Sequence, residues 1–283
     1  MSTATRIRSA RPTELTSRAA AGASRLSSAI AKRSGATGLI PYLTAGYPSL
    51  EGSLELLRAV ERAGAVAAEV GVPFSDPIAD GPDIQRSSEW ALRQGVTVES
   101  ALALVARFRR ESALPVVVMT YANPILRTGS EAFAARARES GVDGVIVSDL
   151  PPEELPDVWR ALDDAGLDTV LLVAPTTSAA RLPALIARCR GFVYCLSRTG
   201  VTGTGGGDAG SLDGRLAAVR ALTELPVAVG FGISTAADAA ALRGRADAAI
   251  VGAAFMRLVR QDLDRGAPER VAAFAAELVA ALS

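Results

Sequence analysis

The stretch EVGVPFSDPIADGP, at residues 69–82, joins a strand-like apolar run to a stiff acidic loop. The run at residues 65–70 predicts a buried strand that ends near Glu69. The prolines that follow stop any helix or strand, so Asp76 and Asp80 lie on a loop. A single loop carboxylate is usually a solvated turn former. Three of them around one strand end, with no adjacent Lys or Arg, instead favour a functional site.

Strand-like runs and helical patterns alternate through the rest of the chain. We expect strands, each followed by a helix, at residues 38–44, 66–70, 116–120, 144–148, 169–173, 192–196, 227–230 and 248–251. The runs are continuously apolar, as in parallel sheets that are buried on both faces. Eight such units in about 250 residues predict an α/β fold, a single (β/α)8 TIM barrel. A doubly wound open sheet is the alternative.

The N-terminal part differs from the rest of the chain. Residues 1–23 are rich in Ala, Ser, Thr and Arg without apolar periodicity, which predicts a disordered extension rather than a transit peptide. Residues 24–33 carry Leu26 and Ile30 on one face, which predicts an extra helix that plugs the bottom of the barrel. We therefore expect the barrel domain to span residues 24–283.

Composition excludes several classes of protein. The chain has no histidine and one lysine, Lys32, which rules out a Ser-His-Asp triad or histidine-ligated zinc and argues against a Schiff-base enzyme. The mildly acidic balance of residues 36–283 argues against a nucleic-acid binder. No apolar run approaches the ~18 residues of a membrane span. Cys189 and Cys195 have neither redox nor zinc spacing and predict core residues in a reducing cytoplasm, with no metal site.

Glycines follow the last three predicted strands. Gly203 and its neighbours follow the sixth strand, Gly230 and Gly232 the seventh, and Gly252 the eighth. Glycine after the seventh and eighth strands, before a short extra helix, is the pattern of the phosphate site of many barrels. Small residues let backbone N–H groups approach the anion, and a helix N-terminus adds partial positive charge. Any one of these glycines alone would be an ordinary turn residue.

Six segments together resemble the tryptophan synthase alpha chain family. They are PYLTAGYP at residues 41–48, EVGVPFSDP at 69–77, ADGPDIQ at 79–85, MTYANP at 119–124, LSRTGVTG at 196–203 and GFGIS at 230–234. The resemblance covers the chain from about residue 26 to the C-terminus. It implies a barrel enzyme that cleaves indole-3-glycerol phosphate to indole and glyceraldehyde 3-phosphate, a retro-aldol reaction. It also implies a beta subunit as partner, in an alpha2-beta2 heterotetramer.

The resemblance assigns roles to particular positions. It implies that Glu69 is the acid–base group and that Asp80 binds the indole N–H. The implied substrate-binding residues are Tyr121, Tyr194, Thr202, Phe231 and Ile84, and the implied phosphate-binding residues are Gly203, Gly232, Gly252 and Ala253. Phe74, Asp76 and Pro77 match the loop that faces the beta subunit. No cofactor is expected in this chain, because pyridoxal phosphate is expected only in the partner.

This chain departs from the family pattern at Ala253, where a serine whose hydroxyl reaches the phosphate is usual. The loop at residues 204–211 is also unusually rich in glycine, so the sequence does not predict which conformation the loop adopts when it closes. Three alternatives stand beside the main interpretation. A stand-alone lyase would use the same residues, an isomerase of a phosphorylated sugar would share the phosphate site, and a non-catalytic barrel would only activate a partner.

Overall fold

A computed structural model gives the structure of the chain at residues 23–31, 35–197, 211–230, 232–261, 263 and 266–283. The strands are β1 (Gly38–Thr44), β2 (Ala68–Gly71), β3 (Val116–Thr120), β4 (Gly144–Val147), β5 (Asp168–Thr169), β6 (Leu171–Val173), β7 (Val193–Leu196), β8 (Val227–Gly230) and β9 (Ala248–Val251). The helices are α1 (Arg25–Ala31), α2 (Leu50–Arg62), α3 (Pro82–Arg93), α4 (Val98–Arg109), α5 (Ala122–Thr128), α6 (Ser130–Glu139), α7 (Pro156–Asp164), α8 (Leu182–Arg188), α9 (Leu212–Arg220), α10 (Ala236–Ala240), α11 (Ala253–Gln261) and α12 (Ala267–Leu282).

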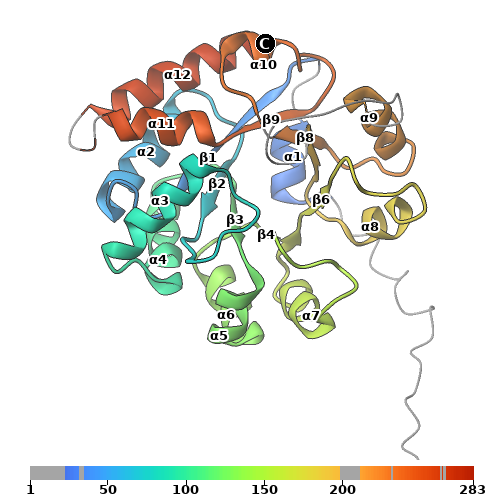
Figure 1. Ribbon diagram of the computed structural model, residues 1–283, viewed down its shortest axis with the longest axis horizontal. Coiled ribbons are helices and arrows are strands. Elements are labelled where there is room, and N and C mark those ends of the chain that lie inside the picture. The colour runs from blue at the N-terminus through green and yellow to red at the C-terminus, as the bar shows by residue number, and fades with distance from the viewer. Residues whose placement is uncertain (1–22, 32–34, 198–210, 231, 262, 264–265) are drawn as a thin grey trace, which may run out of the picture.

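The strands form one parallel sheet that closes into a barrel, with the helices around it (Figure 1). Except for β5 and β6, each strand pairs with the next along the chain, and β1 also pairs with β9. β5 and β6 are two parts of one stretch, interrupted at Val170. β5 pairs with β4, β6 pairs with β7, and the Val170 N–H still donates to the Val145 carbonyl at 3.1 Å. The predicted TIM-barrel fold is therefore confirmed, with its fifth strand split in two.

The buried side chains form two cores, one inside the barrel and one between the sheet and the surrounding helices. The residues that alternate inward along the strands form an inner cluster with Ile40, Val117, Ile146 and Ile250 among its members. The outward residues form the larger cluster between the sheet and the helices. This arrangement explains why each strand reads as continuously apolar, since both of its faces are buried.

Helix α1 closes one end of the barrel. Leu26 and Ile30 are 0% and 1% exposed and belong to the inner cluster, so the predicted plug is confirmed. An ion pair of 3.6 Å between Arg25 and Asp143 joins α1 to the residue before β4. The predicted disordered extension, residues 1–23, lies outside the described residues except for Ala23.

Two local features differ from the sequence-based expectation. Residues 122–128 form α5, so two helices, α5 and α6, follow the third strand where one is expected. Pro124 is the third residue of α5, where the missing N–H and the fixed φ of proline fit the first turn of a helix. The second strand also begins two residues later than expected, at Ala68.

Candidate active site

β2 places Glu69 inside the barrel. Its neighbours Ala68 and Val70 point to the outer core, so the alternation of the strand turns Glu69 inward. Its side chain is 1% exposed, and its Oε2 atom is buried without a hydrogen-bond partner among the described residues. A buried polar atom without a partner costs free energy, which points to a functional reason for keeping it.

Burial sets the protonation state of Glu69. Burial, and to a smaller extent the nearby charge of Asp80, together raise the pKa of the carboxyl from 4.5 to about 8. Glu69 is therefore mostly protonated at pH 7. A carboxyl group in this state is able to donate a proton and then take one back.

Asp80 lies on the loop between β2 and α3, two residues before the helix begins. Burial raises its pKa to about 6, and a hydrogen bond from Tyr121 acts in the opposite direction. The Tyr121 hydroxyl also accepts a hydrogen bond of 3.2 Å from the backbone N–H of Ala79, which fixes the loop next to Asp80. The ring of Phe74 packs on Tyr121, with 5.0 Å between the ring centroids.

The two carboxyl groups therefore differ in charge at neutral pH. Asp80 is mostly ionised and Glu69 mostly protonated, because their pKa values are separated by the deeper burial of Glu69. Pairs of titratable groups whose environments push their pKa values apart are typical of acid–base sites.

Two further tyrosines line the same space. Tyr194 on β7 is 8% exposed, and its pKa is raised by burial and by the charges of Glu69 and Asp80. Tyr42 on β1 has the same causes for its raised pKa, burial first. The motif containing Tyr42 suggested no role for it. The signal that identifies Tyr42 is the register of β1 on β2, because Tyr42 and Glu69 are directly paired and share a face.

Hydroxyl groups hold Tyr42 in place. The Thr44 hydroxyl lies 3.2 Å from the Tyr42 oxygen and 2.6 Å from the Ser87 hydroxyl. The Ser87 hydroxyl donates to the Ile84 carbonyl at 2.8 Å. This chain of hydrogen bonds links β1 to α3, the helix that follows Asp80.

Glycines leave room for the tyrosines at the ends of two strands. A Cβ atom at Gly71 would lie 2.0 Å from the Tyr42 hydroxyl oxygen. At Gly230 it would lie 2.5 Å from the Tyr194 ring. Both glycines are therefore required by the packing around the carboxyl groups.

The described residues of the expected phosphate site lie at the ends of β8 and β9. Gly232 follows β8 with a φ of 87°, a left-handed conformation that favours glycine. Gly252 follows β9, and Ala253 is the first residue of α11. A Cβ atom at Gly252 would lie 3.4 Å from Cδ1 of Ile84, so Ile84 on α3 borders this part of the site.

Other expected site residues cannot be placed in the same way. Thr202, Gly203, Phe231 and most of the loop at 204–211 lie outside the described residues. Of the expected docking loop, Phe74 and Pro77 are half-buried and Asp76 is exposed. Ile78, next to them, is 83% exposed, which is unusual for a large apolar side chain.

Within the described ranges, His, Cys, Asp and Glu side chains form no group of three that would hold a metal ion. Every helix in the part of the chain that the structure describes is too short or too polar to span a bilayer. Cys189 and Cys195 are both buried and unpaired by disulfides, as core residues would be.

Comparison with known proteins identifies the family of the chain. The family model described as tryptophan synthase alpha chain matches residues 28–282. A tryptophan synthase alpha chain of Burkholderia mallei is 48% identical over 249 residues, which are 88% of this chain and 92% of that protein.

Solved structures give the same result. A tryptophan synthase structure from Mycobacterium tuberculosis superposes with a TM-score of 0.83 at 38% identity, covering 92% of this chain and 98% of that one. A tryptophan synthase subunit alpha from Legionella pneumophila superposes with a TM-score of 0.82 at 34% identity, covering 92% and 98%. The family model and these relatives together show that the chain belongs to the tryptophan synthase alpha chain family.

Proposed function

We propose that this chain cleaves indole-3-glycerol phosphate to indole and glyceraldehyde 3-phosphate, with Glu69 and Asp80 as the catalytic residues. The observation that carries this proposal is the buried carboxyl group of Glu69 on β2, whose Oε2 has no partner among the described residues, with the carboxyl group of Asp80 nearby on the following loop. Family membership supplies the reaction, and the site supplies groups that suit each of its steps.

The reaction moves one proton and breaks one carbon–carbon bond. Protonated Glu69 donates its proton to C3 of the indole ring, which makes the ring cationic and weakens its bond to the glycerol carbon. The Glu69 carboxylate then takes the proton of the adjacent hydroxyl, the carbon–carbon bond breaks, and the hydroxyl carbon becomes the aldehyde. Glu69 ends protonated, so the cycle needs no other proton donor.

Asp80 stabilises the charge that forms in between. Its carboxylate accepts a hydrogen bond from the ring N–H, and this bond strengthens as positive charge develops on the ring. The hydroxyl of Tyr121 holds Asp80 by the hydrogen bond that lowers its pKa. Tyr194 and Ile84 border the space for the ring, together with Thr202 and Phe231 by family resemblance.

The phosphate group binds at the ends of β8 and β9. Backbone N–H groups of Gly232, Gly252 and Ala253 are the donors, with Gly203 as a further donor by family resemblance. The N-terminus of α11 adds partial positive charge.

The exposed side chains around Phe74, Asp76 and Pro77 suit docking of a beta subunit, and we propose an alpha2-beta2 heterotetramer in the cytoplasm. Pyridoxal phosphate would then belong to the partner alone.

Steady-state cleavage of indole-3-glycerol phosphate tests the proposal. Glu69→Gln keeps the size of the side chain but removes its titration, and kcat should fall by at least ~100-fold. Asp80→Asn should also lower kcat, because the ring loses its anionic partner. Glu89→Gln, which removes an exposed carboxylate paired with Arg93 on α3, is the matched control and should behave like the wild type.

An active Glu69→Gln variant would refute the proposed mechanism. Repeating the assay while a beta subunit is titrated in separates a true subunit from a stand-alone lyase. A subunit responds with a rise in kcat that saturates at one partner per chain, and a stand-alone lyase keeps the same kcat throughout.

A further inference from the structure

An ionic cluster lies behind the proposed site, where α3 meets α11. Asp83, in the first turn of α3, is three residues after Asp80, and its side chain is only 13% exposed. Its carboxylate forms ion pairs with three guanidinium groups, those of Arg257 at 3.0 Å, Arg260 at 3.1 Å and Arg86 at 3.1 Å. The charge of Asp83 also suits the N-terminus of its helix.

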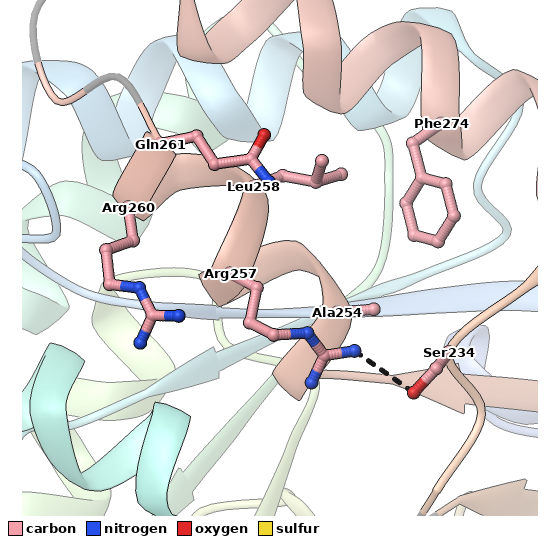
Figure 2. Close-up of a pocket in the computed structure, with 7 residues that line it drawn as sticks. All are labelled: Ser234, Ala254, Arg257, Leu258, Arg260, Gln261 and Phe274. Atoms are coloured by element: carbon pink, nitrogen blue, oxygen red, sulfur yellow. Dashed lines mark hydrogen bonds between the residues drawn. The ribbon is translucent and has the colours of Figure 1, made fainter.

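Arg257 makes two contacts at once. One terminal nitrogen donates to Oδ2 of Asp83 at 3.0 Å, and the other donates to the hydroxyl of Ser234 at 3.1 Å. Figure 2 shows Arg257 reaching from α11 to Ser234, at a surface pocket of about 190 Å³ that Arg260 also lines. The two bonds use different terminal nitrogens of the planar guanidinium, whereas a lysine side chain would offer a single nitrogen to both partners.

Each partner of Arg257 lies two or three residues along the chain from a residue of the proposed site. Asp83 follows Asp80, Ser234 follows Gly232, and Arg257 itself lies one helical turn after Ala253. The Ser234 backbone is held as well, because its N–H donates to Asp238 at 2.9 Å. Arg257 therefore connects the first turn of α3, the turn after β8 and the helix after β9.

We propose that Arg257 is a positioning residue that fixes the distance between Asp80 and the phosphate-binding turn. This inference rests on the proposed function, because it assumes that the substrate binds at both places. The substrate spans them, so a change in their spacing prevents its ring and its phosphate from binding well together. The affinity of a ligand that binds only at the phosphate end would not depend on this distance.

Two ligands separate positioning from simple attraction of charge. Indole-3-glycerol phosphate occupies both ends of the site, and glycerol 3-phosphate occupies only the phosphate end. Arg257→Lys keeps the charge but loses one of the two contacts. Ser234→Ala removes the bridge and keeps every charge. Arg260→Gln is the matched control, since it removes a charge from Asp83 and leaves the bridge intact.

We expect kcat/KM for indole-3-glycerol phosphate to fall about tenfold in Arg257→Lys and in Ser234→Ala, the order of one lost hydrogen bond to a charged group. The Kd of glycerol 3-phosphate, measured by calorimetry, should change less than about twofold in both. Arg260→Gln should match the wild type in both measurements. Urea unfolding of each variant verifies that the fold is kept, and Ser234→Ala carries the test if Arg257→Lys unfolds.

Wild-type kcat/KM in Arg257→Lys and Ser234→Ala would overturn the inference. An equal weakening of glycerol 3-phosphate binding in Arg260→Gln and Arg257→Gln, with Arg257→Lys unchanged, would also overturn it, because charge alone would then be the cause. Failure of the proposed function looks different, since the wild-type chain itself would not cleave indole-3-glycerol phosphate.

Discussion

Replacing Glu69 by Gln should make the protein more stable at alkaline pH while it removes activity. The folded-state pKa of Glu69 is about 8, against an ordinary value of 4.5. Below pH 4.5 the group is protonated in both the folded and the unfolded chain, so it does not change the free energy of unfolding. As the pH rises from 4.5 to 8, the unfolded chain releases this proton and the folded chain holds it. The free energy of unfolding therefore falls through this range and levels off above pH 8.

The size of the effect follows from the shift. Each unit of pKa is worth 1.36 kcal/mol, so the shift gives an upper bound of about 5 kcal/mol. The bound applies without reduction for solvent screening, because Glu69 is only 1% exposed. The Gln variant carries no such titration, so its free energy of unfolding should exceed that of the wild type by several kcal/mol more at pH 8 than at pH 5.

Urea unfolding of both proteins at five pH values between 5 and 9 measures this difference. Comparing the slopes with pH removes any constant cost of the buried amide, such as an unmade hydrogen bond. Asp80 titrates in both proteins and cancels in the same way. Glu89→Gln, at an exposed position, should follow the wild-type slope. Parallel curves for the wild type and Glu69→Gln would refute the reasoning, since Glu69 would then have an ordinary pKa.

Two other changes test the space around the site. Ala253→Ser places a hydroxyl at the start of α11, and it should tighten binding of glycerol 3-phosphate by no more than about tenfold, because water already serves the same oxygen. Calorimetry measures this, and weaker binding would mean that residue 253 faces away from the phosphate. Gly71→Ala puts a methyl group 2.0 Å from the Tyr42 hydroxyl, so it should lower the free energy of unfolding by about 1–3 kcal/mol. Unchanged urea unfolding would show that Tyr42 moves aside freely.

The sequence predicts much of this protein because its signals are local. The apolar run before Glu69 and the prolines after it define a strand end within a few residues. Helix α5 was not predicted from the sequence, and its Pro124 lies in the first turn, where proline is tolerated. The interruption of the fifth strand at Val170 could not be predicted, because the apolar run at residues 169–173 continues through it.

Contacts between distant segments could not be predicted. Tyr42 joins the carboxyl groups only through the register of β1 on β2. Asp83 meets Arg257 from 174 residues away, and both read alone as ordinary surface charges on amphipathic helices. A single sequence shows which residue types are present at a strand end, but the pairing of the strands decides which of them meet.

The pairing of β1 with β9 has a consequence for the chain as it is made. Every other pairing joins strands that are neighbours in sequence, with β5 and β6 counted as one stretch. The β1 edge waits for Ala248–Val251, and Gly38 pairs with Ala248. Until then a nascent barrel exposes unpaired N–H and C=O groups along β1, the kind of edge at which strands of separate molecules associate. Pairing with β9 covers this edge of β1 and removes it as a place where separate molecules could associate.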